Sequence, residues 1–407
     1  MRHSVARTIT LAFVLLALTA GQGLPAQTFT VLHNFTGGAD GASPAAGLTM
    51  DQRGNLYSTA AGGGNEEGAC FSGGCGTVFE LEHRGTSWTF VPLHVFTGAP
   101  DGSHPEARVV FGPDGALYGT TNGGGNTCGG YGCGTVFRLT PPAHACGSVL
   151  CHWTETVLYS FSGGSDGEGP ANGDLIFDQA GNIYGTTYAG GSYGHGTVFE
   201  LSHSNGGWTE NILYSFQGNN DGAEPVAGVV FDNAGNLYGT TFHGGIYGYG
   251  AVSELTHSAS GWTEIILHNF NWSDGVSAAG GLILDASGNL YGATYAGGQD
   301  HAGTVYELSP TSGGWLFNVL YNFAGNEGSY AKLAMDAAGN LYGTLTFTIP
   351  EVFRLTASGG QWTLTGFTGS AGSTPLGNVI FDASDNLYTT ANSGGTNGLG
   401  VVFEITP

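Results

Sequence analysis

A short motif, Gly-Asn-Leu-Tyr or a near copy of it, occurs seven times along this 407-residue chain. Its tyrosines are Tyr57, Tyr118, Tyr184, Tyr238, Tyr291, Tyr342 and Tyr388, spaced by 46 to 66 residues. A repeat of this length indicates a fold assembled from similar units, each of which buries its apolar face against its neighbours. The structure of one unit therefore determines most of the architecture.

Each copy of the motif lies within the same four segments, which are clearest in the third repeat at 174–178, 182–188, 196–201 and 208–216. The segments are short and rich in β-branched and aromatic residues. Gly, Asn, Asp and Ser separate them, which is typical of β-strands joined by tight turns. In the Asp-x-x-Gly-Asn turn, the Asp can hydrogen-bond the turn backbone and the Gly can adopt a positive φ. No helical stretch interrupts this pattern.

Seven units of four antiparallel strands predict an all-β fold, a seven-bladed β-propeller with four-stranded blades. The last repeat stops after its third strand, 401–405, while 29–35 is an isolated copy of the fourth strand. We therefore expect the N-terminal strand to complete the last blade, which closes the ring and removes an exposed sheet edge. A β-solenoid of seven coils is the alternative, but it would need caps and leaves this offset unexplained. Residues 27–407 are expected to be one domain.

Residues 1–26 have the pattern of a secretory signal peptide: Arg2 and Arg7, an apolar stretch at 9–20, then small residues. Cleavage is expected after Ala20 or Ala26, which predicts secretion to the extracellular space or, alternatively, the periplasm. A buried N-terminal helix is disfavoured by the Gly and Pro that follow. After residue 26 no apolar run approaches the roughly 18 residues that cross a bilayer. The end of the sequence directly after the last strand favours release over anchoring.

The six cysteines form three pairs of equal spacing: Cys70 with Cys75, Cys128 with Cys133, and Cys146 with Cys151. Paired cysteines in an exported protein predict disulfide bonds, which here would stiffen loops. Zinc bound by the four thiolates of the first two pairs is the alternative. Zinc sites favour closer cysteine spacing, and the expected compartment is oxidising, so the disulfide interpretation is preferred.

The repeated Gly-Asn-Leu-Tyr-Gly-Thr-Thr, the Gly-Gly loop and Gly-Thr-Val-Phe-Glu-Leu resemble the Gloeobacter/Verrucomicrobia (GloVer) tandem repeat of exported bacterial proteins, over nearly the whole chain after residue 26. The family carries no established activity, so the resemblance implies no catalytic residues. The Asp-x-x-Gly-Asn-Leu-Tyr phrase is also similar to NHL-type and lactonase-type propellers. That likeness leaves an enzyme open by analogy alone.

Charge restricts the choice of partner. Residues 1–26 hold two arginines and no acid, so their removal leaves six bases, 31 acids and a net charge of −25. A surface this acidic repels phosphates and excludes nucleic acid as a partner. We expect an extracellular polar or carbohydrate ligand, or another protein, as the partner of a monomer.

The residue that opens the first strand differs from repeat to repeat. It is Gly47, Gly228 or Gly281 in three repeats, and Arg108, Asp174, Lys332 or Asn378 in the other four. First strands line the channel of a propeller, so these four polar residues are expected at its mouth, with Glu106 and Glu224 from adjoining loops as further candidates. They could bind an anionic or polyhydroxyl ligand. Alternatively, Arg108 and Lys332 pair with Asp174 and plug the channel.

Two patterns could hold a metal ion. The loop that leads into the first strand of each blade, called here the leading loop, carries an acid in six repeats: Asp40, Asp101, Asp166, Asp221, Asp274 and Glu327. These could form a Ca²⁺ site, but one acid per loop favours an Asp-Gly turn whose carboxylate caps its own backbone. His195, His243 and His301 lie in three successive loops, yet their unequal offsets favour ordinary exposed histidines over a metal site. No cofactor is therefore expected, with Ca²⁺ as the alternative.

Repeats this regular leave few irregular residues from which a nucleophile, a base and an electrophile could be drawn. The sequence has no Gly-x-Ser-x-Gly elbow, His-Glu-x-x-His helix or phosphate loop. We expect a secreted binding protein with its site at the channel mouth; the alternative is a hydrolase or lyase acting on a polysaccharide or lactone there. Recurring Trp, Phe and the positions that alternate between His and Tyr, such as His33 and Tyr159, are interpreted as packing.

Overall fold

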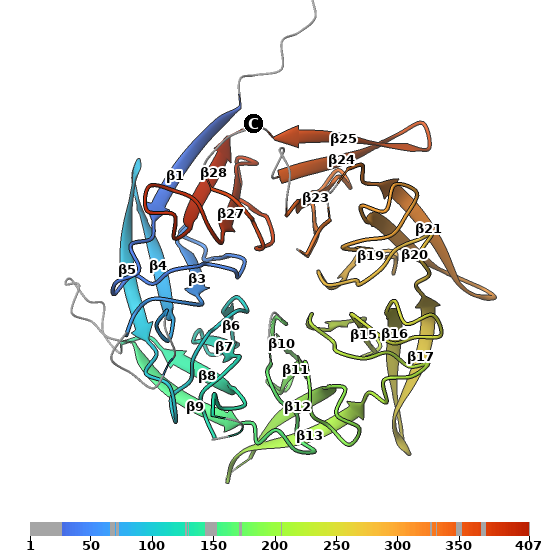
Figure 1. Ribbon diagram of the computed structural model, residues 1–407, viewed down its shortest axis with the longest axis horizontal. Helices are drawn as coiled ribbons and strands as arrows, with labels where there is room; N and C mark the ends of the chain where they lie inside the picture. The colour runs from blue at the N-terminus through green and yellow to red at the C-terminus, as the bar shows by residue number, and fades with distance from the viewer. Residues whose placement is uncertain are drawn as a thin grey trace, which may run out of the picture.

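The computed structural model describes residues 27–65, 70, 73–126, 128, 130–142, 153–170, 173–204, 206–325, 328–330, 332–346, 352–367 and 372–406. These residues form seven four-stranded antiparallel sheets arranged as the blades of a ring (Figure 1). The all-β, seven-bladed propeller predicted from the sequence is therefore confirmed. The expected signal peptide lies outside the described residues. Within the described part of the chain, no helix has the length and apolar character needed to span a bilayer.

Strands follow one another outward from the channel in each blade. The first strands have two residues each: β2 (Thr49–Met50), β6 (Val110–Phe111), β10 (Ile176–Phe177), β14 (Val230–Phe231), β18 (Ile283–Leu284), β22 (Ala334–Met335) and β26 (Ile380–Phe381). The second strands are β3 (Leu56–Ala60), β7 (Leu117–Thr121), β11 (Ile183–Thr187), β15 (Leu237–Thr240), β19 (Leu290–Ala293), β23 (Leu341–Thr344) and β27 (Leu387–Ala391).

The outer strands are longer. The third strands are β4 (Thr77–Arg84), β8 (Thr135–Thr140), β12 (Thr197–Ser204), β16 (Ala251–Ser258), β20 (Thr304–Thr311), β24 (Val352–Ser358) and β28 (Val401–Thr406). The fourth strands are β5 (Ser87–Val95), β9 (Thr154–Ser160), β13 (Gly207–Ser215), β17 (Gly261–Asn269), β21 (Gly314–Asn322), β25 (Gln361–Phe367) and, for the seventh blade, β1 (Thr28–Asn34).

The repeated motif builds the turn between the first two strands. In blade 1, Asp51 accepts hydrogen bonds from the backbone N–H of Asn55 (2.9 Å), from the Asn55 side-chain amide (2.9 Å) and from the Tyr57 hydroxyl (3.3 Å). Blades 3 to 7 repeat all three bonds. One aspartate thus fixes the turn, the asparagine and the tyrosine together, which explains why these residue types recur as a unit.

Aromatic residues hold neighbouring blades together. A phenylalanine after the fourth strand of one blade meets a phenylalanine in the third strand of the next, edge to face. Ring centroids are 5.2 Å apart for Phe96 and Phe137 and 5.3 Å apart for Phe161 and Phe199. All four side chains are fully buried. Each interface therefore contributes one compact apolar cluster between two blades.

The ring closes at the seventh blade, where β1 pairs antiparallel with β28 (Figure 1). The register places Phe29 opposite Ile405 and Val31 opposite Phe403. Beyond the strand, the Phe35 N–H donates to Gly400 O (3.1 Å), and the Ser43 N–H donates to Leu399 O (2.9 Å). The predicted completion of the last blade by the N-terminal strand is confirmed.

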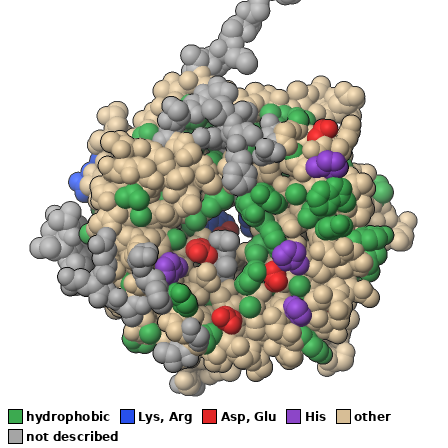
Figure 2. All heavy atoms as spheres, viewed as in Figure 1, with side chains coloured by type: hydrophobic (Ala, Val, Ile, Leu, Met, Phe, Trp, Pro, Cys, Tyr) green, Lys and Arg blue, Asp and Glu red, His purple; other side chains and the backbone are tan. Residues whose placement is uncertain are grey.

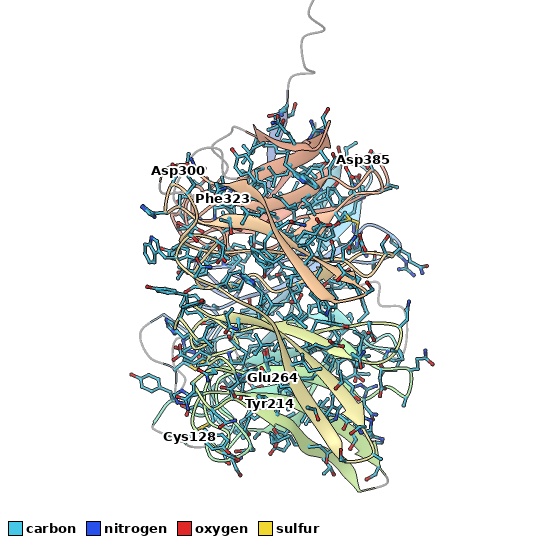
Figure 3. The ribbon with its side chains drawn as sticks, turned by 90° about the vertical axis from the view of Figure 1, so that its right-hand side faces the viewer. Cys128, Tyr214, Glu264, Asp300, Phe323 and Asp385 are labelled. Atoms are coloured by element: carbon cyan, nitrogen blue, oxygen red, sulfur yellow. A yellow bond between two sulfur atoms is a disulfide. The ribbon has the colours of Figure 1, made fainter. Side chains whose placement is uncertain are left out.

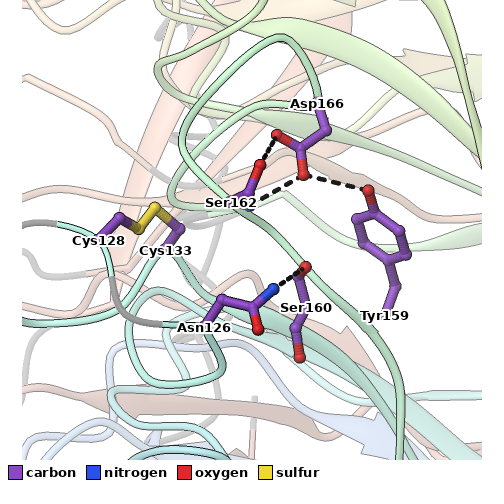
Figure 4. Close-up of a disulfide and its surroundings, with 7 residues drawn as sticks. All are labelled: Asn126, Cys128, Cys133, Tyr159, Ser160, Ser162 and Asp166. Carbon is purple, nitrogen blue, oxygen red and sulfur yellow. Dashed lines mark hydrogen bonds between the residues drawn. A yellow bond between two sulfur atoms is a disulfide. The ribbon is translucent and has the colours of Figure 1, made fainter.

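Two of the three cysteine pairs lie in the described residues, and both form disulfide bonds, Cys70–Cys75 and Cys128–Cys133. The disulfide prediction is confirmed for these pairs. Figure 4 shows the second one beside the start of the leading loop of blade 3. The Cys133 carbonyl accepts the Gly169 N–H of that loop (2.9 Å), and the Cys75 carbonyl accepts the His104 N–H of blade 2 (2.9 Å). Each disulfide therefore stiffens a loop that contacts the next blade.

The described residues include two of the three predicted cysteine pairs and not the third. Its members, Cys146 and Cys151, both lie outside the described residues. A bond between Cys146 and Cys151 stays a prediction from the sequence.

We expect the exported protein to contain no free thiol. With all three pairs closed, its intact mass falls six hydrogens below the reduced mass, which mass spectrometry before and after reduction measures directly. A deficit of four hydrogens would show that Cys146 and Cys151 are reduced. Thiols that titrate in the folded protein, together with stoichiometric zinc, would contradict the disulfide prediction.

Candidate functional site

The inner ends of the blades surround a cavity of about 410 Å³. Figure 2 shows a hollow at the centre of the ring with basic and acidic side chains in it. Five of the six polar residues predicted from the sequence line the cavity: Glu106, Arg108, Asp174, Lys332 and Asn378. The propeller brings them together from blades 2, 3, 6 and 7, although they are spread over more than 270 residues of sequence.

Asp174 lies at the centre of the charged side chains. It accepts a hydrogen bond from Arg108 Nε (2.8 Å), and Lys332 Nζ lies 3.9 Å from the same carboxylate oxygen. Arg108 Nη1 also contacts Leu48 O of blade 1 at 3.4 Å. The pairing considered as an alternative is therefore present, and a cavity lined by the same three side chains accompanies it.

Burial changes the acidity of two groups in this cavity. It lowers the pKa of Lys332; the neighbouring Arg108 acts in the same direction, and Asp174 opposes it. Burial raises the pKa of Glu106, against a hydrogen bond from the Asn122 side-chain amide (3.2 Å). Each group therefore has a smaller preference for its charged form than it has in water.

Glu224, the sixth predicted residue, does not line the cavity. It accepts hydrogen bonds from the Tyr188 hydroxyl (2.8 Å) and from His243 Nδ1 (2.7 Å). Partial burial acts to raise the pKa of Glu224, but these two hydrogen bonds and the electrostatic effect of His243 and His195 outweigh it and lower the pKa. Tyr188 does line the cavity, so Glu224 orients a wall residue.

Three aromatic side chains, Tyr188, Phe242 and Tyr330, form part of the cavity wall. The rings of Phe242 and Tyr330 are nearly parallel, with an interplanar angle of 8° and centroids 6.5 Å apart. Tyr295 packs against Tyr330 at 4.3 Å. Burial raises the pKa of Tyr330 to about 12, so its hydroxyl keeps its proton at a higher pH than an ordinary tyrosine does. The cavity thus combines charged groups with aromatic surface.

The residues selected from the sequence did not include this aromatic wall, but the repeat contains a signal for it. The residue four positions after the motif tyrosine is aromatic in three successive repeats and small or polar in the other four: Tyr188, Phe242 and Tyr295 against Ala61, Asn122, Thr346 and Asn392. The variation at this position marks two of the three wall residues, Tyr188 and Phe242.

The leading-loop acids lie away from the cavity. Their carboxylates accept backbone N–H groups at the start of their own loops, at 2.8–2.9 Å, as Asp40, Asp101, Asp166, Asp221 and Asp274 do. Glu327 lies outside the described residues.

The carboxylates of the leading-loop acids also contact the positions that alternate between His and Tyr. His33 Nε2 lies 3.0 Å from Asp40, and the Tyr159 hydroxyl lies 3.1 Å from Asp166. Packing alone was an incomplete interpretation, because both residue types can donate this hydrogen bond.

Two of the three loop histidines contact Glu224, and the third contacts Trp272. His243 bonds Glu224, His301 Nδ1 accepts the Trp272 indole N–H (2.8 Å), and the His195 carbonyl accepts the Glu224 N–H (2.9 Å). In the part of the chain that the structure describes, one group of three potential metal ligands is found, Cys128, Cys133 and Glu168. Its two sulfur atoms are joined in a disulfide.

The sequence profile of the Gloeobacter/Verrucomicrobia repeat matches residues 19–173 and 129–348. The chain belongs to this repeat family. The resemblance noted in the motifs is therefore confirmed over most of the sequence. No curated protein matches the chain.

Solved structures with the same fold include bacterial proteins that act outside the cytoplasm. PorZ, a surface component of the type-IX secretion system of Porphyromonas gingivalis, superposes with a TM-score of 0.54 at 14% identity, covering 87% of this chain and 46% of PorZ. The extracellular domain of a candidate one-component system from B. thetaiotaomicron superposes with a TM-score of 0.52 at 11% identity. The match covers 89% of this chain and 38% of that one. This GloVer-repeat protein thus spans less than half the length of either chain.

A candidate 6-phosphogluconolactonase from Bacteroides uniformis gives a TM-score of 0.50 at 14% identity, covering 85% of this chain and 94% of that one. At such identities the likeness shows the shared propeller fold alone.

Proposed function

We propose that this GloVer-repeat protein is a secreted, monomeric binding protein that takes an extracellular carbohydrate or other polar ligand in the axial cavity. One observation carries the proposal: charged groups and aromatic surface meet in one cavity, at positions that differ between the repeats. Ligand sites are concave, with aromatic walls and a few polar groups that fix orientation. A volume of about 410 Å³ lies within the usual range for such sites, about 300–1,000 Å³.

Three features support a location outside the cytoplasm. The first 26 residues have the pattern of a signal peptide. Two disulfides close local loops, and disulfides persist in oxidising compartments. The PorZ and one-component-system structures are named as surface and extracellular proteins. Together they favour secretion, where glycans are abundant ligands.

A glycan array followed by calorimetry tests the proposal. We expect Tyr188→Ala to weaken binding about tenfold or more, because it removes an aromatic wall residue that is 40% exposed. Tyr188→Phe keeps the ring and loses only the bond to Glu224, so it should retain most of the affinity. Tyr247→Ala, at an exposed outer-loop tyrosine, is the control. Binding lost in the Tyr247 variant and kept in the Tyr188 variant would move the site to the outer rim.

A hydrolase or lyase acting on a polysaccharide or lactone is the second candidate. It is favoured by the opposite pKa shifts of Glu106 and Lys332 within one cavity, since active sites bring such groups together. Assays of glycosidase, lyase and lactonase activity on the same protein separate the two functions. Turnover that is lost in Glu106→Gln or Asp174→Asn favours the enzyme; retention of glycan without turnover favours the binder.

A further inference from the structure

The cavity concentrates positive charge in a protein that has very little of it. After residue 26 the chain has six basic residues and 31 acidic ones. Two of the six, Arg108 and Lys332, line the axial cavity. The other described bases have different surroundings; Arg84, for example, is mostly exposed and pairs with Glu82 at the end of a blade.

The two cavity bases share one carboxylate, that of Asp174. Arg108 Nε takes the direct hydrogen bond to Asp174, while Lys332 Nζ at 3.9 Å is too far from the same oxygen for one. The second carboxylate of the cavity, Glu106, accepts a hydrogen bond from Asn122, and within the described residues neither base makes an ion pair with it. Two bases therefore share the single carboxylate of Asp174.

Both bases keep donors for a ligand. A guanidinium has five N–H groups, and within the described residues Arg108 makes two hydrogen bonds, to Asp174 and to Leu48. A lysine ammonium has three N–H groups. The side chains of Arg108 and Lys332 are 23% and 24% exposed, and both line the cavity. Donors on two cations can thus meet one anionic group of a ligand.

The aromatic wall determines what else the ligand must present. Phe242 and Tyr330 lie parallel, and Tyr188 is fixed by Glu224. Flat apolar faces of this kind pack against the C–H face of a pyranose ring. A compact inorganic anion would leave this surface unused, and a neutral sugar would leave the two cations without an anionic partner.

We infer that the axial cavity binds an acidic saccharide, with the carboxylate of a uronic-acid unit on Lys332 and Arg108 and its sugar ring against Tyr188, Phe242 and Tyr330. The inference rests on the proposed function and assigns its ligand class. The net negative charge of the protein repels such a ligand at long range, but at physiological ionic strength charges more than about 8 Å away are largely screened. Contacts inside the cavity then decide the affinity.

The test uses matched pairs of ligands on the unmodified protein. Short oligosaccharides of galacturonate, glucuronate and mannuronate are each titrated beside their fully methyl-esterified forms and beside neutral oligosaccharides of equal length. The inference predicts that at least one acid binds about tenfold or more tightly than its ester, because esterification removes the charge-assisted hydrogen bonds.

Variants then assign the preference to the cavity. Lys332→Gln should reduce the ratio of acid to ester affinity about tenfold, and Arg84→Gln, which removes an exposed base, should leave it unchanged. An acid preference that survives in folded Lys332→Gln and is lost in Arg84→Gln would overturn the assignment. Neutral sugars or esters that bind as well as the acids would overturn the ligand class and leave the proposed function standing. If no saccharide of any kind binds, the proposed function itself fails. The comparison of acid and ester needs no variant, so it decides even if Lys332→Gln does not fold.

Discussion

Protein that begins at residue 37 is expected to lose the cooperative unfolding transition that protein beginning at residue 27 shows. The missing residues include β1, which pairs with β28 along its whole length, and Phe35, which is fully buried between blades 7 and 1. Their removal leaves β28 as an unpaired edge and breaks an interface of the ring. Because each blade is stabilised by both neighbours, the loss spreads beyond one blade. Circular dichroism during heating measures the effect.

A point substitution tests the same closure with less disruption. Phe35→Ala should cost about 3–5 kcal/mol of the free energy of unfolding, as expected for a large buried side chain. Val31 lies on the same strand but is 38% exposed, so Val31→Ala should cost less than about 1 kcal/mol. If the shortened protein melts like the intact one, or if the two substitutions cost the same, closure by β1 does not stabilise the ring.

The closure was predictable because the sequence repeats each strand seven times and only its ends break the series. Seven copies of each strand make its identification more certain than one copy would. The last repeat lacks a fourth strand after 401–405, and 29–35 is an extra copy of that strand, so a blade shared by the two ends of the chain explains both. The cavity residues were predictable for a related reason. A propeller brings the same position of every repeat to the same height on the axis, so variation at that position places Arg108, Asp174, Lys332 and Asn378 together.

Details within a blade could not be predicted in this way. Glu224 was expected to face a ligand, yet it adopts φ = +58°, a left-handed conformation that is rare for a non-glycine residue and unexpected before proline. Its side chain contacts His243 and Tyr188 and does not line the cavity. Ser43 and His104 share this conformation at the equivalent positions, so the cause is the loop geometry and not the residue type.

The contact between Asp174 and Lys332 could not be predicted from the repeats either. It joins blade 3 to blade 6, which are not neighbours in the ring. Periodicity determines which residues share a height on the axis, but the width of the channel decides which of them meet across it. That width depends on how closely the inner ends pack. A Cβ atom on Gly47 would lie 1.5 Å from Asn378 Oδ1, and one on Gly228 would lie 2.3 Å from Asp174 O.

A second large effect is expected from acidic groups buried between the blades. The Tyr159 hydroxyl lies 3.1 Å from an Asp166 oxygen and 3.0 Å from a Glu210 oxygen. Tyr214 is placed in the same way between Asp221 (2.8 Å) and Glu264 (3.3 Å), and Figure 3 shows Tyr214 beside Glu264. A phenol has one proton to donate, so it cannot satisfy two carboxylates.

The remaining oxygens of these glutamates confirm the shortage of donors. Oε1 of both Glu210 and Glu264 is buried, and no hydrogen-bond partner for it is found among the described residues. The pKa of each glutamate is raised to about 8, chiefly by burial; the nearby aspartate adds to the rise and the tyrosine hydrogen bond opposes it. Both groups therefore carry a proton in the folded protein at neutral pH, whereas in the unfolded chain they titrate near their ordinary value of 4.5.

The sign of the pH dependence follows from these values. Between pH 4.5 and 8 the folded state binds more protons than the unfolded state, so the free energy of unfolding falls as pH rises through this range. The contribution of Glu210 and Glu264 is complete below pH 4.5 and lost above pH 8. His33 and His104 act in the opposite direction below pH 6.5, because burial lowers their pKa values. A comparison of variants is therefore needed to isolate the glutamates.

We expect the double variant Glu210→Gln, Glu264→Gln to melt several degrees above the unmodified protein at pH 8.5 and close to it at pH 5. Glutamine is neutral at every pH and resembles the protonated glutamate, so it removes the cost of burying a charge. The two histidines are common to both proteins and cancel. Glu168→Gln, at an exposed glutamate in the leading loop of the same blade as Glu210, is the control and should leave the pH profile unchanged. A double variant whose melting temperature follows the same pH slope as the unmodified protein would show that both glutamates are ionised in the folded state, and that the unpartnered oxygens are stabilised by some other donor.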